Sequence, residues 1–236
     1  MGTIFIAGAT GYTGQALVRV GRAAGHGVVA HVRPGSATGD RLVPVFEGLG
    51  ATVDRTPWDA DALAASLSGH APDVVFGLLG TTRAKAAAAA ARGEQATYES
   101  VDRDLSLMLY TAAATLPTPP RFVYLSSLGA NTPGRNRYMR ARAAVEEALA
   151  EGPLPWTSAR PSFITGPDSE ESRPGERIGA ALAGGGLSLL AAVGISGPQA
   201  RYGAMDASEL AEGLLRIAFD AQAAGVAVEA EGLRTP

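Results

Sequence analysis

The chain has 236 residues, a formal net charge of −3 and a pI near 5.7, so it lacks the basic excess that binds nucleic acid. It contains no cysteine, which excludes disulfides, thiolate zinc sites and cysteine catalysis. The histidines, His26, His31 and His70, are scattered without metal-ligand spacing, and we expect no metal centre.

The first predicted strand is an apolar run that stops at a glycine. Residues Ile4–Ala7 have the composition of a buried parallel strand, and glycines follow at every third position before a helical pattern. A strand that enters a helix through such a turn exposes unpaired N–H groups and the positive end of the helix dipole, which bind a dinucleotide pyrophosphate. The predicted phosphate site comprises Gly8, Thr10, Gly11, Tyr12, Thr13 and Gly14.

The second predicted strand, Val28–Val32, is followed by Arg33 rather than by a carboxylate. At this place dinucleotide folds read the adenosine ribose, with an acidic residue for NAD and a basic one for NADP. A guanidinium can bind a 2′-phosphate through two hydrogen bonds, so Arg33 favours NADP(H) over NAD(H). A solvated loop arginine is the alternative. Asp54, after a short third strand at 51–53, would either contact the adenine amine or form a turn.

A fourth predicted strand, Asp73–Gly80, ends in Leu79 and Gly80, which would line the path of the nicotinamide half of the cofactor. A fifth strand covers 121–125, and the main helices are expected at 59–67, 84–91, 98–115 and 138–150. Alternating strands and helices of these lengths indicate an α/β, Rossmann-like doubly wound parallel sheet. We expect a single NAD(P)-binding domain over residues 1–236, with its core at about 1–160 and a small substrate or lid region at about 161–236.

The candidate catalytic residues lie at the end of the fifth strand and on the next helix. Tyr138 and Arg142 are four positions apart, so their side chains project from one helical face. A cation beside a phenol favours its ionised form, which would let Tyr138 donate or accept a proton. A hydroxyl from Ser126 or Ser127 would hold the same substrate oxygen in line for hydride transfer.

These motifs resemble the short-chain dehydrogenase/reductase superfamily in its atypical, extended-like branch. Within that branch the chain is similar to the group of the human Tat-interacting oxidoreductase and its bacterial relatives. Besides the glycine turn, the matching motifs run in the order of the family up to Arg177. They are Leu79–Arg83, Val101–Asp104, Leu125–Ser127 with Gly129 and Ala130, and Glu171–Glu176.

The resemblance implies an oxidoreductase that binds NADP(H) and reduces a carbonyl or quinone-like small molecule, with Tyr138 as proton donor or acceptor. It implies that residues 10–13 bind the phosphates and Arg33 the 2′-phosphate of NADP. It further implies that the segment up to Ile164 passes the nicotinamide and that Arg173 reaches the cofactor or the substrate mouth.

One departure from the superfamily leaves a second function open. The superfamily has Tyr-x-x-x-Lys, and Arg142 occupies the lysine position; arginine keeps the charge, but its ribose contact and proton-relay role are in doubt. The alternative is therefore an NADP(H)-sensing regulatory or interaction module with little or no turnover. A third interpretation, epimerase or dehydratase chemistry on a nucleotide sugar, is disfavoured by the small C-terminal region.

The uncharged stretch Ile178–Ile195 approaches the length of a membrane span. It consists largely of glycine and alanine, which contribute little to insertion, and Gly184–Gly186 would break a helix. We expect no membrane span, and no signal peptide is recognisable, so we expect a cytoplasmic protein. Its expected partner is a small-molecule substrate rather than nucleic acid; a homodimer or a protein partner is compatible with the sequence.

Overall fold

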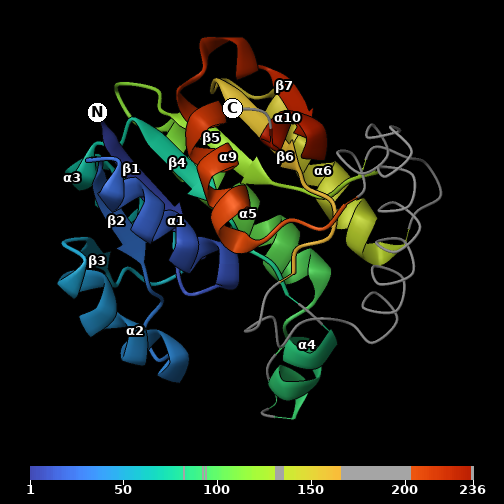
Figure 1. Ribbon diagram of the computed structural model, residues 1–236. Helices are drawn as coiled ribbons and strands as arrows, with labels where there is room; N and C mark the ends of the chain where they lie inside the picture. Colours follow the sequence, from blue (N-terminus) through green and yellow to red (C-terminus); the bar gives the residue numbers. More distant parts are fainter. Residues whose placement is uncertain (82, 92, 94, 131–135, 166–202, 235–236) are drawn as a thin grey trace.

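The computed structural model describes residues 1–81, 83–91, 93, 95–130, 136–165 and 203–234. Over these residues, seven strands form one parallel sheet in the order β3-β2-β1-β4-β5-β6-β7 (Figure 1). The order reverses between β1 and β4, which is the topology of a Rossmann-like doubly wound fold, as predicted. The strands are β1 (Thr3–Ala7), β2 (Gly27–His31), β3 (Thr52–Asp54), β4 (Val74–Gly77), β5 (Arg121–Leu125), β6 (Trp156–Arg160) and β7 (Val226–Glu229).

Helices cover both faces of the sheet (Figure 1). One hydrophobic cluster joins the sheet to α1, α2, α9 and α10, and a second joins its other face to α3, α5 and α6. The helices are α1 (Tyr12–Ala23), α2 (Ala37–Gly48), α3 (Ala60–His70), α4 (Arg83–Ala90), the π-helix η1 (Tyr98–Asp104), α5 (Leu105–Ala114), α6 (Arg137–Glu151), α9 (Ala207–Phe219), the 3-10 turn η2 (Ala221–Ala223) and α10 (Ala230–Arg234).

Alternate side chains of β1 separate the two layers. Ile4 and Ile6 belong to the cluster that contains Leu17 of α1, whereas Phe5 belongs to the cluster that contains Leu63 of α3. All five side chains are fully buried. Because successive residues of a strand point to opposite faces, a shift of one residue would exchange the two sets, so burial on both faces fixes the register of β1.

Two predicted elements differ from the observed ones. The fourth strand ends at Gly77; the amide of Leu78 still donates to Ala7 O at 2.9 Å, and Leu79 and Gly80 then form a loop. The helix expected over 98–115 begins as the π-helix η1 and becomes α-helical only at Leu105. Single π-helical turns occur frequently at functional sites, so this change of winding is relevant to the site described below.

The last two strands were not predicted, and the composition of β6 is unusual for a buried strand. Thr157 and Ser158 of β6 are polar yet fully buried. The Thr157 hydroxyl donates to Ala223 O at 2.6 Å and accepts from the Arg121 guanidinium at 3.0 Å, which satisfies one of these polar groups inside the sheet.

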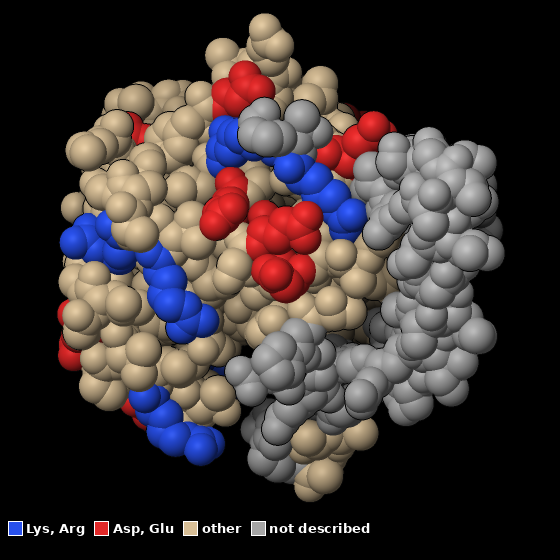
Figure 2. All heavy atoms as spheres, in the orientation of Figure 1, with Lys and Arg blue, Asp and Glu red and all other residues tan. Residues whose placement is uncertain are grey.

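The surface carries charges of both signs. On the face shown in Figure 2, acidic side chains gather near the centre and basic side chains lie on either side of them. No helix among the described residues is long and apolar enough to cross a membrane, and the stretch 178–195 lies outside them. The described residues also contain no group of three metal-binding side chains.

Candidate cofactor and catalytic site

Most of the predicted site residues lie at the C-terminal ends of the parallel strands. We call this row of strand ends the carboxyl edge of the sheet. In doubly wound folds this edge, at the point where the strand order reverses, binds the ligand. The residues that end or follow successive strands are Gly8 after β1, Arg33 after β2, Asp54 in β3, Leu79 and Gly80 after β4, Ser126 and Ser127 after β5, and Ile164 after β6.

The glycine turn between β1 and α1 has a geometry that other residues cannot adopt without strain. Gly8 has φ +89°, and a Cβ on it would lie 2.7 Å from the carbonyl oxygen of Leu78. A Cβ on Gly14 would lie only 2.2 Å from Gly8 O, closer than real Cβ atoms approach backbone. The first and last glycines thus allow the tight turn and the close packing of α1 on β1.

The N-terminus of α1 is suited to bind an anion. Its N-cap is Gly11, which has no side chain to accept from the amides of the first turn, and that turn contains no acidic residue. These N–H groups and the positive end of the helix dipole therefore face outward at the sheet edge. The turn residues fit the pyrophosphate of a dinucleotide, which is the ligand that the glycine spacing predicts.

A hydrogen bond joins the glycine turn to the segment that follows β6. The hydroxyl of Tyr12 donates to Thr165 O at 3.3 Å, while Thr13 is nearly buried at the start of α1. Ile164 forms a parallel bridge with Met205, which returns the chain to α9. Ile164 is therefore held beside the turn, at the place expected for a residue near the cofactor, and Arg173 lies outside the described residues.

Arg33 is exposed, two residues beyond the end of β2. The amide of Val32 donates to Asp54 O at 2.8 Å, which fixes the end of β2 against β3. The hydroxyl of Ser36 accepts from the amide of Gly39 and caps α2, so this hydroxyl already has a partner. Arg33 is exposed, so its guanidinium is accessible to a ligand at this edge, and its contact with a 2′-phosphate stays a prediction.

Asp54 forms a turn, which was one of its two predicted roles. Its carboxylate accepts hydrogen bonds from the amide of Thr56 at 2.9 Å and from the hydroxyl of Ser66 at 2.5 Å, and it lies 3.2 Å from the His70 ring. Burial pushes the pKa of Asp54 up, but the bonds from Ser66 and Thr56 and the nearby His31 outweigh it and lower the pKa. The adenine contact of Asp54 stays a prediction.

Tyr138 and Arg142 lie side by side on α6. The guanidinium carbon of Arg142 is 5.2 Å from the centre of the Tyr138 ring, and the Tyr98 ring meets the same ring edge-on at 5.4 Å. Tyr138 is half-buried, whereas Arg142 is 5% exposed. Arg142 therefore contacts the aromatic face of Tyr138 from the protein side, in a cation–π arrangement.

Arg142 is surrounded by partners that hold its charge in place. Its Nη1 donates to Leu125 O at 2.5 Å and to the Tyr124 hydroxyl at 3.1 Å, and its Nη2 lies 2.9 Å from Asp102 Oδ1. Burial alone would lower the pKa of Arg142, but Tyr124, Tyr138 and Asp102 raise it, so the guanidinium stays protonated. Burial raises the pKa of Tyr124 to about 12, against the opposing effect of Arg142, so Tyr124 stays a neutral phenol.

Asp102 is the site residue that sequence reasoning missed. It is fully buried in η1, and its Oδ2 accepts from the amide of Thr81 at 2.8 Å. The motif Val101–Asp104 was noted only as a family resemblance. A usable signal was present, because an arginine on the apolar face of a helix needs a buried counter-ion and this motif contains a carboxylate.

The two serines after β5 differ in exposure. Ser126 is 4% exposed, and within the described part of the chain its hydroxyl has no hydrogen-bond partner. Ser127 is half-buried, and its carbonyl oxygen accepts from the amide of Ala130. A buried hydroxyl without a partner at the sheet edge is suited to bind a ligand oxygen.

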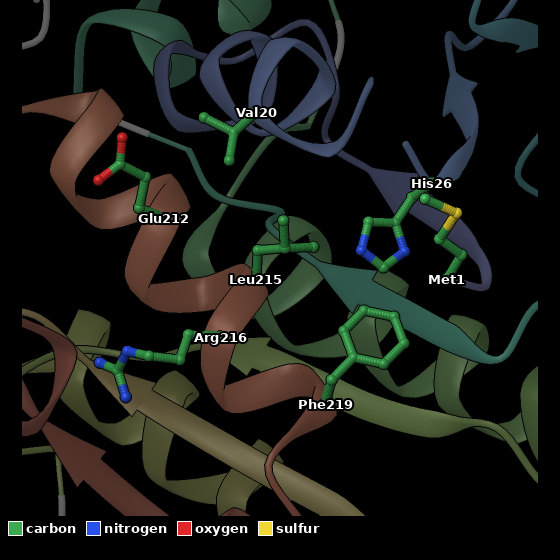
Figure 3. A pocket seen from close by; sticks show the side chains of 7 residues that line it. All are labelled: Met1, Val20, His26, Glu212, Leu215, Arg216 and Phe219. Atoms are coloured by element: carbon green, nitrogen blue, oxygen red, sulfur yellow. The ribbon is translucent and has the colours of Figure 1, made fainter. Parts of the chain in front are cut away.

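A surface hollow of about 450 Å³ lies at the opposite edge of the sheet, near the amino ends of the strands (Figure 3). In Figure 3 the rings of His26 and Phe219 face each other; their centres are 4.6 Å apart. The Arg216 side chain is already bonded to Gly232 O at 2.6 Å. We do not place the cofactor there, because the glycine turn and Tyr138 lie at the carboxyl edge.

The fold and the glycine turn define a protein of the NAD(P)-binding Rossmann type. Residues 8–185 match the family described as NAD(P)H-binding, and the chain belongs to this family. Protein fmp52, mitochondrial, from Emericella nidulans is 34% identical over 114 residues, which are 48% of this chain and 46% of that protein. The chain thus spans less than half the length of this curated relative.

Solved structures share the fold at low identity. The 3-oxoacyl-[acyl-carrier protein] reductase of Brucella melitensis, in complex with NAD, has a TM-score of 0.65 and 18% identity over 99% of this chain and 97% of its own. A Bacillus halodurans protein provisionally assigned as an NAD-dependent epimerase/dehydratase has a TM-score of 0.67 and 15% identity, over 99% of each chain. At these identities the likeness shows the fold alone.

The close approach of Gly14 to Gly8 predicts the effect of one added methyl group. We expect Gly14→Ala to lower the affinity for NADPH at least tenfold, because the new Cβ must push α1 away from Gly8 O. Titration calorimetry measures this affinity. Gly48→Ala is the matched control, since a Cβ there meets no atom within 4 Å. Equal loss of NADPH affinity in both variants would contradict the prediction that the glycine turn binds the cofactor.

The lowered pKa of Asp54 predicts a pH-dependent contribution to stability. A depressed carboxyl pKa stabilises the fold above the unfolded value of about 4, and this contribution disappears as the pH falls. We expect Asp54→Asn to cost about 1–3 kcal/mol at pH 7, with a smaller difference below pH about 4. Urea unfolding at several pH values tests this, with the exposed Asp61→Asn as control; a pH-independent difference would contradict it.

Proposed function

We propose that the chain is an NADP(H)-dependent oxidoreductase of the atypical short-chain dehydrogenase type that reduces a carbonyl or quinone-like small molecule. The observation that supports this best is the position of Tyr138, which lies against a buried cation on the helix after β5, in a fold whose glycine turn suits a dinucleotide. Membership of the NAD(P)H-binding family is consistent with it. The motifs shared with the Tat-interacting oxidoreductase group favour that branch.

The residues at the carboxyl edge fit the cofactor. The turn Gly8–Gly14 and the N-terminus of α1 would bind the pyrophosphate, and Arg33 would bind the 2′-phosphate. Leu79, Gly80 and Ile164 would line the nicotinamide half. When bound, the nicotinamide ring supplies the hydride for the reduction.

The chain itself would supply a proton and a fixed position for the substrate oxygen. The hydroxyls of Ser126 and Ser127 would bind that oxygen, and Tyr138 would donate its phenolic proton to it. Arg142 would stabilise the phenolate left behind, since its guanidinium lies over the ring of Tyr138 and stays protonated. We further propose one domain over residues 1–236, with the substrate region from about residue 161 onward.

The 2′-phosphate assignment predicts a cofactor-specific loss. Arg33→Asp should raise the Kd for NADPH by about 10–100-fold, because a charge-assisted pair becomes a repulsion, and should change the Kd for NADH by only a few-fold. Calorimetry with both cofactors at fixed ionic strength measures this. Arg19→Asp makes the same charge change on an exposed arginine of α1 and should affect neither. Equal losses for NADPH and NADH in Arg33→Asp would refute the assignment.

The role of Tyr138 predicts a separation of turnover from binding. Tyr138→Phe keeps the ring but removes the proton, so NADPH oxidation with a panel of small quinones and carbonyls should fall by about 100-fold or more. The Kd for NADPH should stay within about threefold. Tyr98→Phe removes a hydroxyl from the neighbouring ring and is the control, which should keep both turnover and NADPH binding. An NADP(H)-sensing module would bind cofactor equally and be indifferent to Tyr138→Phe, and that result would favour the alternative function.

A further inference from the structure

A buried ion pair connects the loop after β4 to the helix that carries Tyr138. Asp102 is fully buried and Arg142 is 5% exposed, and their charged atoms lie 2.9 Å apart. The second carboxylate oxygen of Asp102 accepts from the amide of Thr81, at the end of the loop that contains Leu79 and Gly80. One side chain of η1 thus contacts both the predicted cofactor loop and the predicted catalytic helix.

Gly80 is the point where loop and guanidinium approach most closely. A Cβ on Gly80 would lie 2.7 Å from Arg142 Nη2 and 3.5 Å from Asp102 Oδ1. The other terminal nitrogen of the guanidinium, Nη1, donates to Leu125 O and to the Tyr124 hydroxyl, so the guanidinium cannot easily move aside. The backbone at Gly80 therefore packs directly on the charged pair.

We propose that Asp102 is a positioning residue that couples the Leu79–Thr81 loop to Arg142, so that the cofactor loop and the Tyr138 helix behave as one unit. The inference rests on the proposed function for its catalytic meaning, but the coupling is a property of the chain alone. The coupling also explains why position 142 has an arginine and not a lysine. A planar guanidinium can contact Asp102, Leu125 O and Tyr124 at the same time, which a single ammonium group does less well.

The physical basis is the cost of an unpaired buried charge. Loss of either partner leaves the other charged group uncompensated in a dry site, and the local structure must open to hydrate it. Opening at Arg142 releases Asp102, and Asp102 in turn releases the Thr81 amide. Arg142 should therefore control the order of Thr81 through Asp102.

Hydrogen exchange at the Thr81 amide tests the coupling in cofactor-free protein. In Arg142→Met and Asp102→Asn we expect this amide to exchange at least tenfold faster, relative to the amide of Phe76 in the core of β4. Leu149→Ala is the control, because it removes a fully buried side chain from the same helix without touching the pair. Unchanged relative exchange at Thr81 in Arg142→Met would overturn the proposal.

The double variant Asp102→Asn/Arg142→Met keeps the test decisive if the single variants fail to fold, because it leaves no unpaired buried charge. Because the two side chains act through one link, the increase in Thr81 exchange in the double variant should be smaller than the product of the two single increases; multiplied effects would overturn the coupling. If only the double variant folds, wild-type exchange at Thr81 would overturn it.

Cofactor affinity gives the functional readout. The Kd for NADPH should rise at least tenfold in Arg142→Met and stay within about threefold of wild type in Leu149→Ala. Equal loss of affinity in both variants would mean that the Asp102–Arg142 pair only stabilises the fold, and would contradict its positioning role. Should the wild-type chain bind neither NADPH nor NADH, the proposed function fails, while exchange at Thr81 still decides whether Asp102 couples loop and helix.

Discussion

The packing of α1 against the end of β1 is the constraint on which the rest of the site depends. Gly14 approaches the carbonyl oxygen of Gly8 so closely that even one methyl group has no room, and Gly8 itself turns the chain in the left-handed region. This contact places the N-terminus of α1 at the carboxyl edge of the sheet, at the point where the strand order reverses. Arg33, the loop after β4 and the segment near Ile164 then surround that helix end because each follows a neighbouring or nearby parallel strand.

A second constraint is electrostatic and lies beneath Tyr138. The sequence pattern suggested a cation that acts on the phenol alone, but the structure pairs that cation with Asp102 and buries both. The positive charge next to the Tyr138 ring is thus shared with a carboxylate, and its field at the phenol is weaker than that of an isolated cation. Proton transfer by Tyr138 depends on how strongly the charge of Arg142 acts on its phenol. The Asp102–Arg142 pair therefore bears on whether the chain is an enzyme or a sensing module.

The parts of the structure that sequence reasoning reached are those with local signals. The apolar run Ile4–Ala7 and the glycines after it specify a strand, a turn and a helix within a dozen residues, and this junction was predicted correctly. Strand β6 was missed because Thr157 and Ser158 are polar, and the groups that satisfy the Thr157 hydroxyl, Arg121 and the carbonyl of Ala223, are distant in the sequence. Asp102 was missed as a site residue because its partners, Thr81 and Arg142, are 21 and 40 positions away and no local pattern encodes such a contact.

The central claim is that the turn between β1 and α1 binds a dinucleotide, and titration calorimetry of the purified chain with NADPH and with NADH tests it most directly. We predict saturable binding at one site per chain, with NADPH bound more tightly than NADH because of Arg33. If neither cofactor binds at millimolar concentration, the turn is not a dinucleotide site, and the glycines serve only to pack α1 on the sheet.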